Sequence, residues 1–246
     1  MKAFCFSWMM IATCLVGGVR AEVINFDDIS DNGTGTPIQN GYHGFNWNNL
    51  YALNVQAFSA MPYIGANGYL NGLVSGPNVA FNGYSGKSDT NGDGGPALVS
   101  SGLFTFNSAY FNSAWNDGMS ITVTGKLAGK VVDEKTFIVS ADSPATTTDP
   151  ITKATLEVFN WSRIDEVDFT ASGGTPHAGY NGMGAHFVMD NFDVTPLVTL
   201  LVPTADPPSA PEPSRVVGLA GLGGVAIAFG MLRGLRRRRS SSIAVR

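Results

Sequence analysis

The most specific run of possible metal ligands in the chain is Asp89-Thr90-Asn91-Gly92-Asp93-Gly94. Carboxylate and amide oxygens at alternate positions converge on one point when the following glycine permits a tight turn, and Ca²⁺ prefers such oxygens. The twelfth position of the run is Ser100, not the bidentate glutamate of an EF-hand, and no helical period flanks the run. The motif therefore predicts either a bare calcium loop through Asp89, Asn91 and Asp93 or a solvated surface turn.

A second pair of acids lies at the two ends of the same region. Asp27 follows the apolar stretch that begins at Val23, and Asp190 lies in the last apolar stretch, 186–194. If these first and last strands pair antiparallel, they close the domain and bring Asp27 and Asp190 together. Such closing strands resemble those of carbohydrate-binding-type jelly rolls, and the resemblance implies a structural Ca²⁺ between the termini. The sequence does not require a cofactor, and the metal ion that it suggests is a structural Ca²⁺.

Aromatic residues gather in two short stretches, 42–51 and 110–115. The C–H faces of sugar rings stack on exposed Trp or Tyr rings, and Asn side chains bond the hydroxyls. The candidates for glycan contact are Trp47, which Asn residues flank, with Tyr51 and Trp115. The alternative is that these rings form the core, which a domain without disulfides needs.

Signals for catalysis are weak. The three histidines, His43, His177 and His186, are dispersed and lack the spacing of a metal pair, and each is predicted to be a turn or surface residue. No nucleophile elbow or phosphate-binding loop is present. Adjacent acids such as Asp133-Glu134 point to opposite faces of a strand, whereas Glu166 and Asp168 would share one face, which is also a common solvated pattern. The chain is therefore predicted not to be an enzyme, with a glycan-active enzyme as the rival hypothesis.

The charge distribution excludes one class of partner. Residues 22–206 hold 6 basic and 18 acidic side chains, a net charge of −12, and most of the remaining basic residues lie near the two ends of the chain. Nucleic-acid binding needs clustered Lys and Arg to release counterions, so this region does not bind DNA or RNA.

The first 21 residues have the pattern of a secretory signal peptide. A basic residue near the start precedes an apolar run, and Val19-Arg20-Ala21 offers a cleavage site for signal peptidase. Cys5 and Cys14 both lie in this leader, so the mature protein would contain no cysteine and no disulfide.

The other end combines three features. Val202–Ser214 has five prolines in 13 residues and forms an extended linker, Val216–Leu232 is uncharged over 17 residues, and Arg236–Arg239 follows. As a helix, the uncharged segment spans ~25 Å, enough for a thin bilayer core. Because basic flanks stay cytoplasmic, the tail predicts a transmembrane helix with its C-terminus inside and the acidic region outside.

Pro211-Glu212-Pro213, followed by that apolar span and the arginine cluster, resembles the PEP-CTERM sorting signal of Gram-negative bacteria that make extracellular polysaccharide. The resemblance implies that an exosortase-like membrane transpeptidase recognises Pro211, Glu212 and Pro213, cuts near them and passes the protein from the inner membrane to the cell surface or matrix. The sorting signal predicts where the protein goes but not what its exported domain does, because unrelated domains carry the same tail.

Frequent Asn-Gly dipeptides and the absence of a sustained helical period predict short strands joined by turns. In 119–127, Ile121, Val123 and Leu127 alternate with polar residues, as in a half-buried strand. The fold class is all-β: a single jelly-roll-like β-sandwich over 22–200, with a linker at 201–214 and the membrane helix with its tail at 215–246. The predicted strands are Val23–Phe26, Tyr51–Phe58, Val79–Phe81, Leu103–Phe106, Ser120–Leu127, Lys135–Ser140, Thr155–Phe159, Glu166–Thr170 and His186–Val194.

Residues 32–50 and 60–95 are rich in Gly and Asn and are predicted to be long loops over the sandwich, where binding residues are expected. Together these features predict an exported, non-enzymatic surface or matrix protein that is structural or binds extracellular polysaccharide. The alternatives are a secreted glycan-active enzyme and an envelope protein whose tail is never cut.

Overall fold

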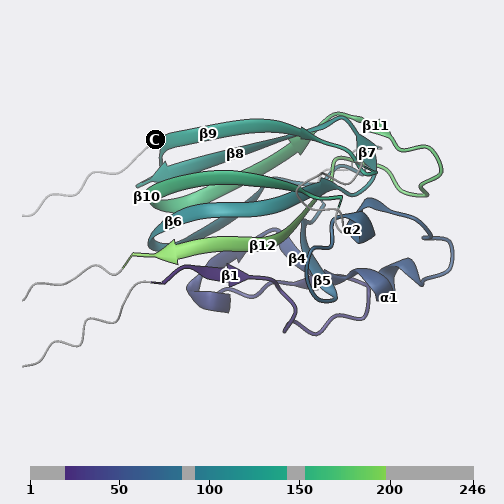
Figure 1. Cartoon of the computed structure of the whole chain (residues 1–246), viewed down its shortest axis with the longest axis horizontal. Coiled ribbons are helices and arrows are strands. Elements are labelled where there is room, and N and C mark those ends of the chain that lie inside the picture. Colours follow the sequence, from purple (N-terminus) through teal and green to yellow (C-terminus); the bar gives the residue numbers. More distant parts are fainter. Residues whose placement is uncertain (1–19, 85–91, 143–152, 198–246) are drawn as a thin grey trace, which may run out of the picture. The chain divides into compact units, whose positions relative to one another are not determined.

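The computed structural model describes residues 20–84, 92–142 and 153–197 (Figure 1). These residues all belong to the first of two compact units, 1–200 and 201–246. Several predicted features lie outside the described residues: the leader up to residue 19, the linker, the sorting motif, the apolar segment 216–232 and the calcium ligands Asp89 and Asn91. Within the described part of the chain, no helix combines the length and apolar character needed to cross a membrane.

Strands dominate the described residues, and the helices are short. The strands are β1 (Glu22–Ile24), β2 (Thr36–Pro37), β3 (Asn46–Asn48), β4 (Leu50–Asn54), β5 (Asn78–Asn82), β6 (Ala97–Ser113), β7 (Asn116–Asp117), β8 (Met119–Leu127), β9 (Lys130–Val139), β10 (Thr155–Ser172), β11 (Thr175–Pro176) and β12 (Phe187–Pro196). The helices are η1 (Tyr42–Gly44), α1 (Val55–Ser59) and α2 (Gly68–Asn71). For the described residues, the prediction of an all-β domain is confirmed.

Ten strands form one antiparallel sheet in the order β2-β4-β5-β12-β6-β10-β8-β9, with β1 paired to β12 and β3 paired to β6. In Figure 1 the strands β9, β8, β10, β6, β12 and β1 follow one another from top to bottom. A small second sheet pairs β11 with β7. The first and last strands, β1 and β12, therefore close the domain side by side, as the sequence predicts.

The long strands β6 and β10 bend so sharply that the sheet folds back on itself. Phe106 pairs with Trp161 in the ladder and Ala97 pairs with Phe169. On a straight strand, Trp161 and Phe169 would lie ~26 Å apart, yet the rings of Phe106 and Phe169 are only 6.4 Å apart. The register shifts between Val158 and Glu166 make this bend, and the core lies inside it, between two layers as in a sandwich.

Alternation along β8 and the packing of aromatic rings explain the core. Met119, Ile121 and Val123 are fully buried, whereas the residues between them face outward, as the period of two predicts. Leu127 departs from the prediction and is exposed; it is the last residue of β8 and lies at the turn into β9. At the bend, the Phe106 ring stacks on Phe159 and Phe192, with centroids 4.4 and 4.7 Å away.

Two strand predictions need correction. The segment predicted as a strand to Phe58 leaves the sheet at Asn54, because the Asn54 side chain accepts a hydrogen bond from the Ala57 amide and caps helix α1. The predicted strands Thr155–Phe159 and Glu166–Thr170 are two arms of one bent strand, β10. The polar residues between them resemble a turn in sequence but form the bend instead.

The bend predicts where the fold is most sensitive. Replacing Phe106 by Ala removes a ring that stacks on two others and leaves a cavity, so we expect a loss of about 3–5 kcal/mol in the free energy of unfolding. Urea denaturation of the full chain measures it. Leu156→Ala, on the same ladder but half-exposed, is the matched control and should cost less than about 1 kcal/mol. Equal losses in the two variants would contradict this account of the core.

Candidate functional site

A hollow of about 260 Å³ lies beside strands β4 and β5, next to the residues that precede β2 and those that follow β5. We call it the aromatic hollow, and its lining consists of Thr34, Gly35, Tyr51, Phe81, Gly83 and Tyr84. Tyr51 and Phe81 are partners in the β4–β5 ladder, and their ring centroids lie 5.6 Å apart. Cross-strand pairing thus fixes two neighbouring rings in one wall.

Two glycines keep these rings uncovered. A Cβ atom on Gly83 would lie 2.4 Å from the Tyr51 ring, and one on Gly35 would lie 3.1 Å from the Phe81 ring. Gly35 also has a φ of +84°, which L side chains rarely adopt. Side chains at either position would therefore crowd the aromatic wall.

Tyr84 supplies the exposed rim of the hollow. Its side chain is 74% exposed, and the edge of its ring meets the His186 ring with centroids 5.0 Å apart. Its backbone forms a bridge with Gly94, which fixes the residue to the next segment of chain. The described lining carries no charged side chain, so the hollow offers ring faces and small polar groups, a surface that suits an uncharged ligand with C–H faces.

Trp47 and Trp115 do not join Tyr51 in this hollow. Trp47 is 5% exposed, packs against Phe26 and Phe192 with centroids 5.6 and 5.7 Å away, and donates Nε1–H to the Tyr42 carbonyl. Neither ring face is open to a sugar. The expectation that Trp47 is the leading glycan contact is corrected: it is a core residue.

Trp115 is buried for a different reason. It is 8% exposed and lies against Phe58 and Tyr69. The backbone of Gly182 covers its indole so closely that a Cβ there would lie 2.3 Å from the ring. Of the three aromatic candidates, Tyr51 is therefore the one that reaches a hollow.

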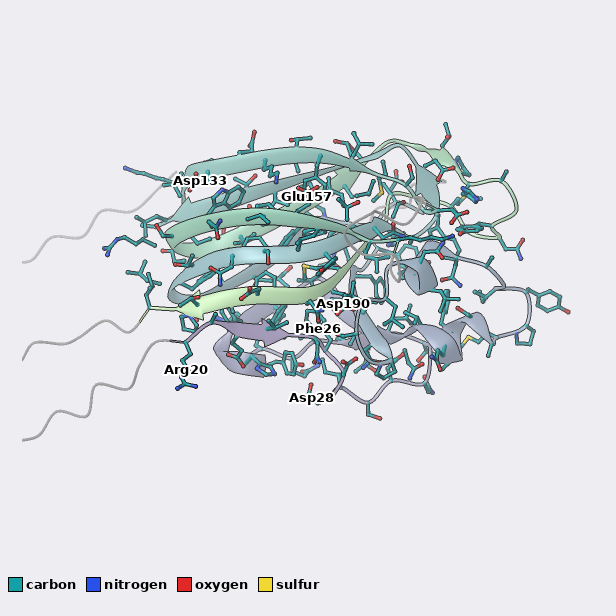
Figure 2. The ribbon with its side chains drawn as sticks, viewed as in Figure 1. Arg20, Phe26, Asp28, Asp133, Glu157 and Asp190 are labelled. Carbon is teal, nitrogen blue, oxygen red and sulfur yellow. The ribbon has the colours of Figure 1, made fainter. Side chains whose placement is uncertain are left out.

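Asp190 lies beside the segment that carries Phe26 (Figure 2), as the strand pairing requires, and its charge therefore interacts with that of Asp27, the next residue. Asp190 is fully buried; one carboxylate oxygen accepts from the Val74 and Ser75 amides and the other from the Asn191 amide. Asp27 accepts from the Asn78 amide. Both carboxylates thus hold the 74–78 segment against the closing strands.

Burial changes the titration of both acids. Burial is the main cause that raises the pKa of Asp190, to about 7, and the neighbouring Asp27 charge raises it further. The three backbone hydrogen bonds that Asp190 accepts lower the pKa and so oppose part of this rise. The pKa of Asp27 is also raised, first by burial. A cation between the two carboxylates would reverse both effects. Calcium at this place stays a prediction.

The remaining predicted metal ligand with described coordinates is Asp93, which accepts a hydrogen bond of 2.8 Å from the Ala185 amide. The described residues contain no group of three or more His, Cys, Asp or Glu side chains placed to hold a metal ion. A calcium ion here would therefore need amide, carbonyl or water oxygens as well.

The histidines and the paired acids have local partners. His43 contacts Glu22, and His177 lies 2.7 Å from Asp117. His186 departs from the prediction of a turn or surface residue: it is buried, and its ring nitrogens lie 2.8 Å from the carbonyl oxygens of Asn82 and Gly92. It fixes the 92–95 segment to β5.

Glu166 and Asp168 share one face of β10, and both contact the Lys126 ammonium on β8. A lysine that bridges two carboxylates on an outward sheet face is a structural ion pair. Neither acid lines the aromatic hollow.

Comparison with known proteins gives no family. No family model matches the chain, and no curated protein matches it. Among solved structures, a DUF4465 family protein from Bacteroides caccae is 11% identical, with a TM-score of 0.42 over 73% of this chain and 94% of that one. The cleaved adhesin domain K1 of Lys-gingipain from Porphyromonas gingivalis is 9% identical, with a TM-score of 0.37 over 73% and 99%.

A third structure, TmCBM61 in complex with β-1,4-galactotriose, is 11% identical, with a TM-score of 0.29 over 65% of this chain and 97% of that one. At these identities and scores, what the three proteins bind is not carried over to this chain.

Two residues of the aromatic hollow, Phe81 and Tyr84, were not among the sequence candidates. Phe81 was assigned to a strand and Tyr84 to a loop. The signal for both residues is their place in the Gly/Asn-rich segment 60–95, where binding residues are expected.

The buried acid pair predicts how stability depends on pH. The folded pKa of Asp190, about 7, exceeds its ordinary value of 3.8, so the folded state binds more protons than the unfolded state between these values. Without calcium, the free energy of unfolding should therefore fall as pH rises from 5 to 8, by at most about 1.4 kcal/mol per pH unit from this group. Urea denaturation of the full chain in EDTA measures this slope.

In the Asp190→Asn variant, the free energy of unfolding should depend less on pH. This variant should also be less stable than the wild type at pH 5, because its side-chain N–H group then faces a backbone N–H group. The control Glu134→Gln changes an exposed acid and should keep the slope. An unchanged slope in Asp190→Asn would contradict the assignment. Repeating the series with calcium tests the predicted ion, which would stabilise the protein more at pH 8 than at pH 5.

Proposed function

We propose that this protein binds neutral polysaccharide at the cell surface or in the extracellular matrix through the aromatic hollow. The observation that carries the proposal is the set of ring faces of Tyr51, Phe81 and Tyr84, kept open by Gly35 and Gly83. Aromatic faces and sugar C–H faces are complementary, and both lose contact with water when they stack.

The electrostatics favour an uncharged glycan. No charged side chain stands in the described lining of the hollow, so a carboxylate or sulfate on the ligand would find no counter-charge there. The net charge of −12 over residues 22–206 repels anionic polymers at longer range. Neutral hexopyranose polymers therefore fit the site better than uronic acid polymers.

The tail supports the place of action. The PEP motif, the apolar segment and the arginine cluster would bring the domain to the outer face of the inner membrane and then to an exosortase-like transpeptidase. Release of the tail would transfer the domain to the cell surface, where it could meet extracellular polysaccharide. The sorting step and the binding step are separate proposals with separate tests.

The binding proposal predicts the effect of removing one ring. Tyr84→Ala and Tyr51→Ala should each weaken binding about tenfold, because each removes one stacking face, roughly 1.4 kcal/mol. Affinity electrophoresis of the full chain in gels that contain neutral polysaccharides such as galactan, glucan or mannan measures it. Tyr63→Ala is the matched control, since Tyr63 is 91% exposed but lies outside the hollow.

Retardation of the wild type by one of these polymers and its loss in the two hollow variants would support the proposal. Equal binding by all four proteins, or retardation only in an anionic polymer such as alginate, would contradict it.

The sorting proposal predicts the mass of the mature protein. Replacing Pro211, Glu212 and Pro213 by Ala should leave the apolar segment attached and the protein in the inner membrane, because the transpeptidase loses its recognition motif. Intact mass spectrometry of protein from cell fractions of the native host measures this. The control replaces Pro207 and Pro208 in the same linker and should be processed normally. Wild-type surface protein that still carries residues 216–232 would show that the tail is not cut.

A further inference from the structure

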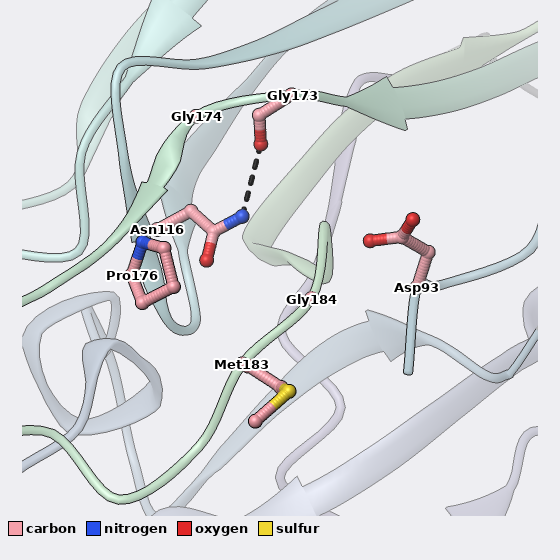
Figure 3. Close-up of a pocket in the computed structure, with 7 residues that line it drawn as sticks. All are labelled: Asp93, Asn116, Gly173, Gly174, Pro176, Met183 and Gly184. Atoms are coloured by element: carbon pink, nitrogen blue, oxygen red, sulfur yellow. Dashed lines mark hydrogen bonds between the residues drawn. The ribbon is translucent and has the colours of Figure 1, made fainter. Parts of the chain in front are cut away.

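A second hollow, also of about 260 Å³, lies where four segments of the chain meet (Figure 3). We call it the Asp93 hollow, after the one charged side chain in its described lining. The other lining residues are Asn116, two apolar residues, Pro176 and Met183, and three glycines. None of them lines the aromatic hollow.

Asn116 belongs to the wall of this hollow and offers no free polar group to a ligand. The residue is 6% exposed, and its Oδ1 is buried. Its side-chain nitrogen donates to the Gly173 carbonyl at 2.9 Å, the hydrogen bond drawn in Figure 3. Asn116 therefore holds the glycine segment in place, and the side-chain group in the described lining that is left for a polar contact is the Asp93 carboxylate.

The Asp93 carboxylate is held in a fixed position facing the hollow (Figure 3). Its Oδ1 accepts a hydrogen bond of 2.8 Å from the Ala185 amide, and no described residue donates to its Oδ2. The backbone next to it is fixed as well, because the His186 Nε2 atom lies 2.8 Å from the Gly92 carbonyl oxygen. One carboxylate oxygen thus positions the group, and the other is left for a ligand.

The Asp93 hollow and the aromatic hollow are neighbours. Tyr84, the rim of the aromatic hollow, forms an antiparallel bridge with Gly94, the residue next to Asp93. Gly92 lies between the two linings: a Cβ atom there would lie 3.9 Å from the Tyr84 ring and 4.0 Å from the Met183 carbonyl oxygen. Because Gly92 has no side chain, the described residues leave the space between the Tyr84 ring and Met183 open.

The Asp93 hollow presents the two kinds of group that bind a sugar unit. A carboxylate accepts hydrogen bonds from hydroxyl groups, and such charge-assisted bonds are about twice as strong as neutral ones. Met183 is 57% exposed and Pro176 is also exposed, so both offer apolar surface to the C–H groups of a sugar ring. The described lining has no lysine, arginine or histidine, and the Asp93 charge repels anionic sugars. The hollow therefore favours neutral glycans, as the aromatic hollow does.

The two hollows together have the size of one binding site. Each alone is smaller than the about 300–1,000 Å³ of typical small-molecule sites, whereas the two together lie within that range. We propose that the Asp93 hollow is a second subsite of the glycan site: its carboxylate accepts hydroxyl groups of one sugar unit while another unit of the same chain stacks in the aromatic hollow. This inference rests on the proposed function and adds the length of the ligand to it, because the protein then recognises a segment of polysaccharide and not a single sugar.

The dependence of binding on glycan length tests the second subsite. In affinity electrophoresis of the full chain with the galactan, glucan or mannan that retards the wild type, the monosaccharide and the linear tetrasaccharide of that polymer are added as competitors. For the wild type, the tetrasaccharide should compete about tenfold better than the monosaccharide, because a second subsite adds contacts to a ligand that is already held.

Two variants of the Asp93 hollow should lose this gain. Asp93→Asn keeps an acceptor for the Ala185 amide but removes the charge, and Met183→Ala removes exposed apolar surface. In each variant the gain from monosaccharide to tetrasaccharide should fall to about threefold or less, whereas competition by the monosaccharide, which the aromatic hollow binds, should not change.

Asp133→Asn and Leu70→Ala are the matched controls, since they change an acid and a 43% exposed apolar residue outside both hollows. They should keep the full gain, and thermal melting checks that every variant folds. If no neutral polymer retards the wild type, the proposed function is contradicted and this inference with it. If Tyr84→Ala weakens retardation but the two competitors act equally on the wild type, the proposed function stands and this inference alone is overturned. A full gain in both Asp93→Asn and Met183→Ala would overturn it as well.

Discussion

The bend in the paired strands β6 and β10 is the constraint on which the rest of the structure depends. No cysteine lies among the described residues, so packing and hydrogen bonds, and not disulfides, hold these residues together. The bend requires positive φ angles at Asn160 and Arg163, which non-glycine residues adopt at a cost of about 1–3 kcal/mol each. The contacts of the Phe169 ring with Phe106 and Phe111, with centroids 6.4 and 6.1 Å away, offset this cost, because these rings meet only when the two arms fold together.

The aromatic hollow depends on how strand β5 ends. Asn82, the last residue of β5, is buried, and its side chain accepts from the Phe187 amide and donates to the Gly95 carbonyl. Gly83 and Tyr84 follow it in the chain and line the hollow. One buried asparagine thus fixes the point from which the rim of the hollow continues.

The sequence patterns predicted the features that depend on the order of apolar and polar residues along a single strand. The alternation in β8 predicted its buried face, and the first and last apolar stretches predicted the pairing that brings Asp27 and Asp190 together. They did not predict what depends on residues distant in the chain. Trp47 is flanked by asparagines and reads as exposed, but β3 pairs with β6 and places its ring against Phe192. Likewise, the sequence predicts a break between Phe159 and Glu166, because period alone does not distinguish a bend within a strand from a break between two strands.

Buried asparagines show how the turns of this domain are held to its strands. In Asn78, Asn112 and Asn116, the amide nitrogen donates to a backbone carbonyl while Oδ1 has no partner. The Asn112 nitrogen contacts three carbonyls, those of Gly68, Ser113 and Ala141. The Asn78 nitrogen donates to the carbonyls of Phe26 and Ile29 and so holds the segment after β1 against β5. In each case the nitrogen joins segments that are distant in the chain, and packing must offset the cost of the unpartnered oxygen, about 1–3 kcal/mol.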